Sequence, residues 1–223
     1  MILPRAFIFD LNGTIIDDMG YHAIAWENMI NNHLKAGISW EEVKANMYGK
    51  NEELLVRIFG EDRFTKEEMA TLSLEKERLY QEAYKPLMKC IDGFEAFVCK
   101  ALEQGVAMGI GSAAIMFNID FILDGLNLRK YFKSIVSADD VLISKPHPET
   151  FLNVAAQLGI APEACVVFED APKGVESAAN AGMKCIVITT MHGKEEFANY
   201  SNILFFVDDY RDARLYSDLL ANS

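Results

Sequence analysis

The sequence has few of the features that mark secreted or membrane proteins. Its four cysteines show no Cys-x-x-Cys spacing, and Cys165 and Cys185 lie in apolar runs, which favours reduced core residues in a cytosolic protein. No apolar run approaches the roughly 18 residues of a membrane-spanning helix, and residues 1–5 are too short a segment for a signal peptide. We therefore expect a cytoplasmic protein without a membrane partner.

Positive charge is also scarce. The chain has 33 acidic residues against 21 lysines and arginines, which gives a formal net charge of −12. Such a surface repels nucleic acid and anionic lipid, so neither is expected as a partner. An anionic small substrate is compatible with this charge where cations, including a metal ion, gather locally. With 51% hydrophobic residues the composition is that of an ordinary globular protein, which we expect to be a monomer.

A short apolar run at residues 6–9 predicts a strand that is buried on both faces. Asp10 follows it directly, and Gly13 and Thr14 come next. Ligands of open parallel sheets bind beyond the carboxyl ends of the strands, so Asp10 lies where chemistry is expected. The simpler alternative is an aspartate that only caps a turn.

Residues 15–90 have the pattern of a small helical bundle. Apolar residues recur there at steps of three and four. Ser39 with Glu42, and Thr65 with Glu68, have capping-box spacing and predict two helix starts. The buried face of the last helix is expected to carry Met69, Leu72, Leu79 and Ala83.

Strands and helices alternate from residue 91 onward, which predicts an α/β fold with a doubly wound parallel sheet. The core would combine residues 1–14 with 91–223, and residues 15–90 would form an inserted helical cap. The further strands are expected at residues 106–111, 134–137, 164–168, 184–189 and 203–207.

Polar groups follow three of these strands. Ser112 comes after the second strand, before main-chain amides that we expect to open a helix, an arrangement that suits a phosphate oxygen. Lys145 lies in a loop that prolines stiffen, between the third strand and its helix. Glu169 and Asp170 follow the fourth strand.

Together with Asp10, these residues supply a nucleophile, a hydroxyl and a cation for a phosphoryl group, and acids that suit Mg²⁺. Phosphoryl transfer requires mainly positioning and charge neutralisation. Oxygen ligands favour Mg²⁺ over zinc, and no cluster of histidines and cysteines competes.

Four segments then resemble the motifs of the haloacid dehalogenase superfamily: residues 10–14 (Asp-Leu-Asn-Gly-Thr), 111–113 (Gly-Ser-Ala), 145–148 (Lys-Pro-His-Pro) and 169–175 (Glu-Asp-Ala-Pro-Lys-Gly-Val). The helical insert resembles the small cap of that superfamily, whose core is Rossmann-like. Residues 17–22 with Trp26 resemble the beta-phosphoglucomutase-like branch. The resemblance spans nearly the whole chain.

The resemblance implies a role for each acidic position. Asp10 would be the nucleophile that forms an aspartyl-phosphate, and it would also bind Mg²⁺. Asn12 would give its main-chain carbonyl to the metal and Asp170 a side-chain oxygen, while Glu169 would orient the metal shell.

The resemblance also implies the phosphoryl contacts. Ser112 and Lys145 would bind the phosphoryl oxygens, and Ala113 would contribute only a backbone amide.

Asn12 departs from the family pattern. Members that act on phosphate esters normally carry aspartate there, which protonates the leaving oxygen and later activates water. A carboxamide cannot accept and return a proton in this way. Three explanations stay open: a substitution made to slow turnover, another acid, or a leaving group that needs no proton. We favour a natural variant with slow or unusual chemistry.

The cap is where this family selects substrates. His22 is either a hydrogen-bond donor to the substrate or a satisfied helical histidine. The turn Gly49, Lys50 and Asn51 resembles the family's cap loop, and Lys50 is a candidate substrate contact or a solvated lysine. Glu52 occupies the position of the mutase arginine for a second phosphate.

Two charged residues lie near the points where the chain crosses between core and cap. Asp18 and Lys85 are expected to be exposed linker charges, with a place facing the cleft as the alternative.

The first functional hypothesis is a Mg²⁺-dependent hydrolase or phosphotransferase for a small phosphorylated metabolite. Because of Asn12, a catalytically damped protein that binds a phosphometabolite is the alternative. A sugar phosphate mutase is a further one, against which Glu52 counts. Hydrolytic dehalogenation does not suit the acids Glu169 and Asp170.

Overall fold

The computed structural model describes residues 4–220, so residues 1–3 of the segment weighed as a signal peptide lie outside the described residues. The chain forms two compact units. One combines the residues up to Asp17 with those from Lys89 onward, and the other comprises Asp18–Met88. No helix among residues 4–220 combines the length and the apolar character needed to cross a bilayer.

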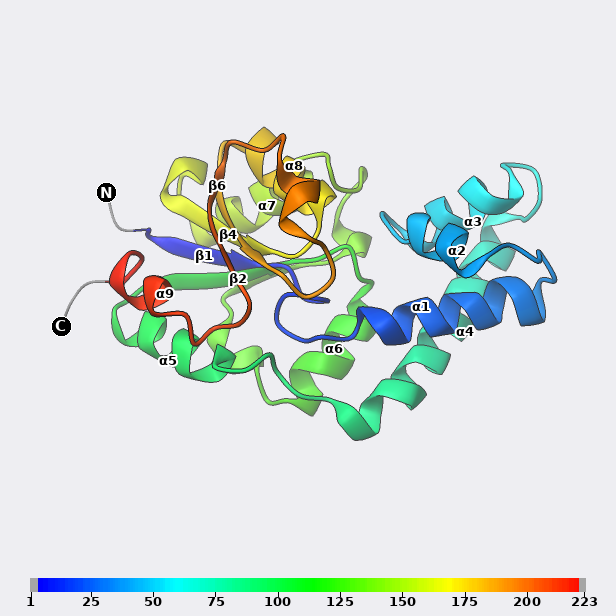
Figure 1. Cartoon of the computed structure of the whole chain (residues 1–223), viewed down its shortest axis with the longest axis horizontal. Helices are drawn as coiled ribbons and strands as arrows, with labels where there is room; N and C mark the ends of the chain where they lie inside the picture. Colours follow the sequence, from blue (N-terminus) through cyan, green and yellow to red (C-terminus); the bar gives the residue numbers. More distant parts are fainter. Residues whose placement is uncertain (1–3, 221–223) are drawn as a thin grey trace. The chain divides into compact units, whose positions relative to one another are not determined.

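The first unit is built on a six-stranded parallel sheet with the order β3-β2-β1-β4-β5-β6. Figure 1 labels β1, β2, β4 and β6 of this sheet. The chain therefore runs outward from β1 in one direction and returns to run outward from β4 in the other. The prediction of a doubly wound parallel sheet is confirmed. The strands are β1 Ala6–Phe9, β2 Ala107–Gly111, β3 Ser134–Val136, β4 Cys165–Glu169, β5 Lys184–Ile188 and β6 Ile203–Val207.

Strand β1 lies between β2 and β4, where Phe9 pairs with Ile110 on one side and Phe168 on the other. All four of its residues are fully buried, as the apolar run predicts. The direction of winding reverses between β1 and β4, and ligands of such sheets bind at this switch point, beyond the carboxyl ends.

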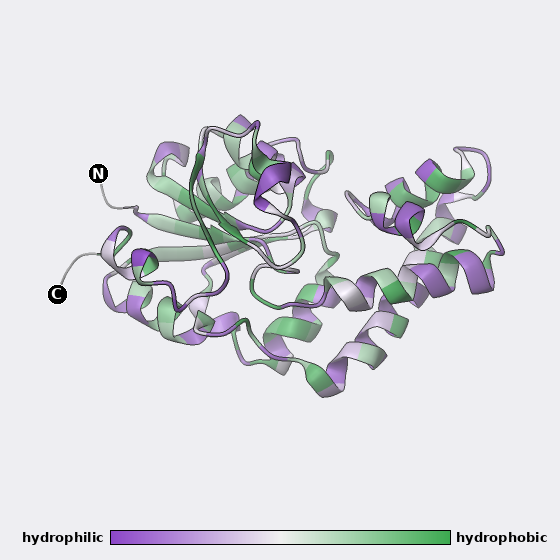
Figure 2. Ribbon diagram, in the orientation of Figure 1, coloured by the Kyte–Doolittle hydropathy of each residue, from purple (hydrophilic) through white to green (hydrophobic). Residues whose placement is uncertain are grey.

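Helices cover both faces of the sheet. Ala6 and Ile8 face a cluster with Phe151 of α7 and Val175 of α8. On the opposite face Phe7 stacks on Phe97 of α5, with ring centroids 5.4 Å apart. Figure 2 shows hydrophobic colour along the strands and mixed colour on the helices, as expected for helices with one buried side. The helices are α5 Phe94–Glu103, α6 Met116–Gly125, α7 Glu149–Leu158, α8 Pro172–Asn180 and α9 Ala213–Ser217.

The second unit is helical throughout its described secondary structure. Both predicted capping boxes are present: Ser39 and Thr65 each accept a hydrogen bond from the amide of the glutamate three residues later. Its elements are α1 Met19–Glu27, continued by a π-helical turn Asn28–His33, then α2 Trp40–Ala45, α3 Asn51–Phe59, α4 Lys66–Tyr84 and a 3₁₀ turn Lys85–Leu87.

The buried face of α4 differs from the prediction. Leu79 is 42% exposed and Ala83 is also exposed, whereas Lys76, Glu77 and Tyr80 are buried together with Leu72. The prediction is confirmed for Leu72, which is buried, and for Met69, which packs against the core of this unit, and it is wrong for Leu79 and Ala83. Hydropathy assigns charged side chains to solvent, so the pattern left out Lys76 and Glu77. The reason is that Lys76 and Glu77 belong to a buried polar cluster, described below.

Thr65→Ala removes the side-chain acceptor for the Glu68 amide. We expect the free energy of unfolding to fall by about 1 kcal/mol, measured by urea denaturation. Thr71→Ala is the matched control, because Thr71 is exposed inside the same helix and donates only to the Glu67 carbonyl. Equal losses in the two variants would show that the cap contributes nothing specific.

Candidate functional site

Asp10 is the residue that directly follows β1, and it lies at the switch point of the sheet. Its amide donates to the Phe168 carbonyl at 2.9 Å, which ties it to the neighbouring strand β4. The residue is only 7% exposed. Glu169 ends β4 and Asp170 follows it, so three carboxylates lie at adjacent strand ends.

Lys145 joins two of these carboxylates. Its Nζ donates to Asp10 Oδ1 at 2.6 Å and to Glu169 Oε1 at 2.8 Å, and it lies 4.5 Å from the centre of the Phe151 ring. Burial alone lowers the pKa of this ammonium, but the Asp10 and Glu169 carboxylates outweigh burial and raise the pKa above its ordinary value. The two carboxylates therefore favour the charged form of Lys145.

The loop that carries Lys145 is anchored to α8. Ser177 donates to the His147 carbonyl at 2.8 Å, and Asn180 donates to the Pro146 carbonyl at 2.9 Å. Both acceptors directly follow the lysine in the chain, so the loop has little freedom to withdraw the ammonium.

Glu169 is held at both of its oxygens. Oε1 accepts from Lys145, and Oε2 accepts from the amides of Asp170 and Ala171, both at 2.8 Å. A Cβ at residue 174 would lie 1.7 Å from Oε1, so only glycine fits there. Glu169 thus acts as a fixed scaffold at the end of β4.

Asp170 packs against the turn that follows Asp10. The Thr14 hydroxyl lies 3.4 Å from Asp170 Oδ1, and a Cβ on Gly13 would lie 2.1 Å from Oδ2. Gly13 also has φ +74°, a conformation that favours glycine. Burial, and then the charges of Glu169 and Asp10, raise the pKa of the Asp170 carboxyl well above its usual range.

Ser112 lies at the same edge of the sheet, directly after β2, and is buried. Its hydroxyl accepts from the Ala114 amide at 3.1 Å, so Ala113 lies in a tight turn and not at a helix terminus. The expectation that a helix opens directly after Ser112 is wrong, because α6 begins at Met116 and its first amide donates to Asp139 at 2.8 Å. The main-chain amides next to the Ser112 hydroxyl therefore belong to this turn and not to α6.

In the helical unit, His22 belongs to a buried polar cluster. Its Nδ1 lies 2.7 Å from Lys76 Nζ, its Nε2 lies 3.4 Å from Asp18, and its ring stacks on Tyr80 at 3.8 Å. Lys76 is 1% exposed and also contacts Glu77 at 3.0 Å. Burial lowers the pKa of Lys76, and the negative charges of Glu77 and Asp18 partly offset this lowering. Asp18 is completely buried, so its interpretation as an exposed linker charge is wrong, whereas Lys85 is exposed.

The predicted cap loop occupies another part of the same unit. Gly49 has φ +73°, and the Lys50 amide donates to Glu53 at 3.0 Å at the start of α3. Asn51 is the first residue of that helix and not part of the turn, and its side chain donates to Glu77 at 2.7 Å. Asn51 therefore extends the polar cluster around His22.

The sequence patterns missed several residues of these arrangements. Lys76 stands four residues after Leu72 and four before Tyr80, so its place on a buried stripe was the available signal. Thr190, whose hydroxyl donates to the Gly13 carbonyl, follows β5 closely, which is the same strand-end position that singled out the other polar groups. No pattern in the sequence points to Tyr210, whose phenol donates to the Thr14 carbonyl.

The charged side chains described at this edge of the sheet are three carboxylates and one ammonium, and all four residues are buried. This group has an excess of negative charge in a desolvated place, which attracts a cation, and it offers a carboxylate beside a fixed ammonium and a serine hydroxyl. Such a set can bind and attack a phosphoryl group once the excess negative charge is neutralised.

Comparison with known proteins points the same way. The sequence profile of the haloacid dehalogenase-like hydrolase family matches residues 7–188. The chain is 31% identical over 192 residues to the beta-phosphoglucomutase of Bacillus subtilis, with 80% of each chain covered. It is 30% identical over 184 residues to the fructose-1-phosphate phosphatase YqaB of Escherichia coli K12, which covers 80% of this chain and 93% of that enzyme.

Solved structures share the whole architecture. The beta-phosphoglucomutase of Clostridium difficile matches with a TM-score of 0.81 at 26% identity, over 93% of this chain and 92% of that one. The family that the sequence resembles is thereby confirmed. This chain belongs to the haloacid dehalogenase-like hydrolase family, in its beta-phosphoglucomutase-like branch.

Proposed function

We propose that this chain is a Mg²⁺-dependent phosphoryl-transfer enzyme that hydrolyses a small phosphorylated metabolite through Asp10. The observation that carries the proposal is the buried group formed by Asp10, Lys145, Glu169 and Asp170 at the switch point of the sheet. Relatives named as fructose-1-phosphate and hexitol phosphatases favour a sugar or hexitol phosphate as the substrate class. Glu52 on α3 gives no positive charge for a second phosphate, which favours a monophosphate over the bisphosphate of a mutase.

The donor set fits a hard divalent cation. Among the described residues, no three side chains of histidine, cysteine, aspartate or glutamate are arranged to hold a metal ion. We propose that the carboxylates of Asp10 and Asp170 hold Mg²⁺ together with the main-chain carbonyl of Asn12, while Glu169 orients this shell. All of these donors are oxygens, which Mg²⁺ prefers. The bound cation would neutralise charge on the phosphoryl oxygens.

In the proposed reaction an Asp10 carboxylate oxygen attacks the phosphorus, and the bond to the leaving oxygen breaks. Lys145 and Ser112 bind the phosphoryl oxygens, together with the Ala113 amide, and the leaving alkoxide takes up a proton from solvent water. Water then attacks the aspartyl-phosphate, which releases phosphate and restores Asp10. Asn12 lacks the carboxyl group that would move both protons, so turnover of unactivated esters is slow.

We further propose that the helical unit is the cap of this enzyme and supplies substrate contacts from His22 and from Gly49, Lys50 and Asn51. His22, which is buried, and Asn51, which is partly buried, both contact Glu77, and these contacts fix their side chains. This organisation suits recognition of substrate hydroxyls, because pre-ordered polar groups lose little entropy on binding.

A panel of sugar phosphates, assayed with and without Mg²⁺, tests the function. Asp10→Asn is expected to abolish phosphate release because the nucleophile is lost. Intact-mass measurement of the parent after incubation with substrate should reveal the covalent phosphoryl adduct, and Asp10→Asn should show none. Activity of Asp10→Asn within about tenfold of the parent would contradict covalent catalysis at this residue.

Asp170→Asn tests whether the buried carboxyl of Asp170 destabilises the metal-free protein when it is ionised. A raised pKa in the folded state means that the favourable contribution of Asp170 is present at low pH and is lost as the pH rises from about 4. The free energy of unfolding of the metal-free parent should therefore fall over this range, and less steeply in Asp170→Asn. Mg²⁺ at a hundredfold excess over Kd should add about 2.7 kcal/mol to the free energy of unfolding of the parent but not of Asp170→Asn.

Asp124→Asn is the matched control for this measurement. Its carboxylate is exposed, and the Arg129 hydrogen bond lowers its pKa, so its titration lies below the tested range. This variant should retain the pH slope of the parent and its response to Mg²⁺. A slope unchanged in Asp170→Asn would mean that this carboxyl is not the group that destabilises the metal-free site.

Asn12→Asp should raise the turnover of phosphate esters by about 10² to 10⁴-fold, because it restores a general acid and base. The first step should gain less with activated aryl phosphates, which need no protonation. Steady-state and single-turnover kinetics separate the two steps. The double variant with Asp10→Asn is the control and should stay inactive. An Asn12→Asp protein that binds Mg²⁺ and yet turns over no ester in the panel would favour the phosphometabolite-binding alternative.

A further inference from the structure

The chain leaves Asp10 through a tight turn at residues 11–16. The amides of residues 14–16 all point to the Leu11 carbonyl, at 2.9 to 3.4 Å. The carbonyls of residues 13–15 consequently have no partner within the turn. Buried carbonyls require donors, so the position of the turn depends on the groups that supply them.

Thr190 supplies the first donor. Its hydroxyl donates to the Gly13 carbonyl at 2.6 Å from just beyond the end of β5. The preceding residue, Thr189, turns to the other side and donates to Asp208 at 2.7 Å. Two adjacent threonines thus have different partners, and only one of them contacts the turn.

Tyr210 supplies the second donor. Its phenol donates to the Thr14 carbonyl at 3.0 Å, and the residue is completely buried. The ring packs edge-on against Phe94 at 5.0 Å, and the Tyr210 amide donates to the Asp92 carbonyl at 3.0 Å. A ring fixed in this way holds its hydroxyl at one position, so it stabilises one position of the Thr14 carbonyl.

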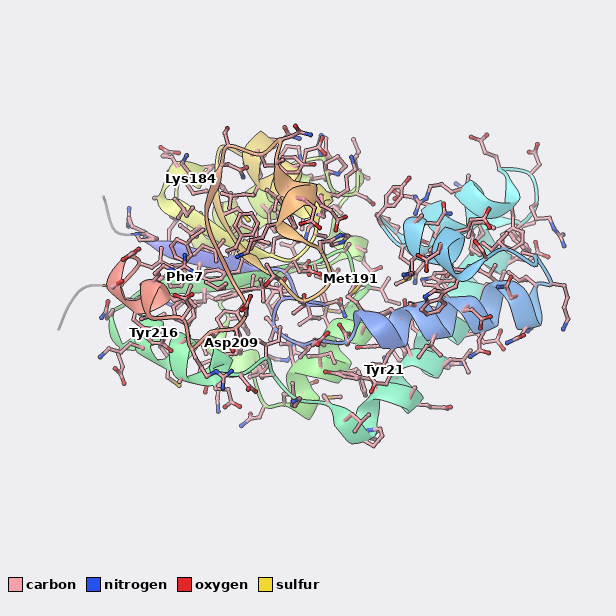
Figure 3. The ribbon with its side chains drawn as sticks, in the orientation of Figure 1. Phe7, Tyr21, Lys184, Met191, Asp209 and Tyr216 are labelled. Carbon is pink, nitrogen blue, oxygen red and sulfur yellow. The ribbon has the colours of Figure 1, made fainter. Side chains whose placement is uncertain are left out.

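Both donors come from parts of the chain that lie far from the turn in sequence. Figure 3 labels Met191 and Asp209, which adjoin Thr190 and Tyr210 in the segments after β5 and β6. The Ile15 carbonyl is held differently, by the Ile91 amide at 2.9 Å. Side chains therefore support the part of the turn that is nearest to Asp10.

The supported peptides adjoin the proposed metal donors. Gly13 packs against Asp170 Oδ2, and the Thr14 hydroxyl lies 3.4 Å from Asp170 Oδ1. Asn12, whose carbonyl is a proposed Mg²⁺ ligand, immediately precedes them. Any shift of residues 13 and 14 would move the Asn12 carbonyl and the Asp170 carboxylate relative to each other.

We propose that Thr190 and Tyr210 are positioning residues that hold this turn in the geometry required for divalent-cation binding. The inference rests on the proposed function, because it acts through the Asn12 carbonyl and Asp170. Loss of either hydroxyl leaves a carbonyl without its donor, and the turn shifts to find another. Partners that orient metal ligands typically contribute about 10- to 100-fold to metal affinity.

The test compares Thr190→Val and Tyr210→Phe with two matched controls. Both substitutions remove a hydroxyl and preserve the shape of the side chain. Thr189→Val removes the neighbouring hydroxyl, which bonds to Asp208, and Tyr131→Phe removes the hydroxyl of another buried tyrosine, which accepts from Cys99 Sγ at 3.5 Å. Thr190→Ser keeps the hydroxyl and should behave as the parent does.

Two readouts are needed, and neither depends on turnover. Hydrogen exchange of residues 11–16, measured without metal, should be faster in Thr190→Val and Tyr210→Phe than in the controls. Calorimetric titration with Mg²⁺ alone should give an affinity at least about tenfold weaker in the same two variants. Thermal unfolding identifies any variant that fails to fold, and Thr190→Ser then decides whether the hydroxyl itself is required.

Exchange in the turn that matches the controls would overturn the inference. Faster exchange with unchanged Mg²⁺ affinity would also overturn it, because the two residues would then serve the fold alone. Failure of the proposed metal site has a different signature: the parent protein itself would give no binding heat. That result would overturn the positioning role together with the metal proposal.

Discussion

The structure depends on how buried negative charge is balanced at one edge of the sheet. Three carboxylates converge there, and desolvation makes each of them unfavourable unless it is paired. Lys145 pairs with two of them, at 2.6 Å and 2.8 Å. Many surrounding features serve this pairing: α8 anchors the lysine loop, main-chain amides bind the far oxygen of Glu169, and glycines stand where a Cβ would displace a carboxylate. The third carboxylate, Asp170, is left with a raised pKa, which is why a divalent cation is a chemically sensible partner.

The order of the strands explains why these groups meet. Two neighbouring strands of a doubly wound sheet lead into helices on opposite sides of the switch point, so their connecting loops separate and leave a polar crevice. Here the two strands are β1 and β4, which present Asp10 and Asp170. The adjacent strand β2 adds Ser112, and the loop after β3 reaches inward with Lys145. Each functional group therefore has a separate segment of chain to hold it, and each is fixed by contacts of its own.

Much of this arrangement could be predicted from the sequence, because strands that are buried on both faces consist of short runs of apolar residues. The fold class and both capping boxes follow from such local patterns, and polar residues that directly follow apolar runs identify Asp10, Glu169 and Asp170. Patterns of hydropathy could not find the buried face of α4, since Lys76 is stabilised there by specific partners that hydropathy ignores. The turn after Ser112 was missed because helix signals locate a start only to within a few residues. Tyr210 could not be anticipated at all, because its contact with the turn depends on the path of the whole chain.

The central strand has a consequence for how the protein is made. β1 is synthesised before both of the strands that pair with it, which begin at Ala107 and Cys165. A nascent chain therefore carries an unpaired and wholly apolar strand until β2 and β4 have been made, while the contiguous helical unit is already complete. Exposed strands of this kind pair with other chains when concentrations are high, and non-local pairings are slow to form. The insertion that separates β1 from the rest of the sheet thus lengthens the period during which newly made chains need protection from aggregation.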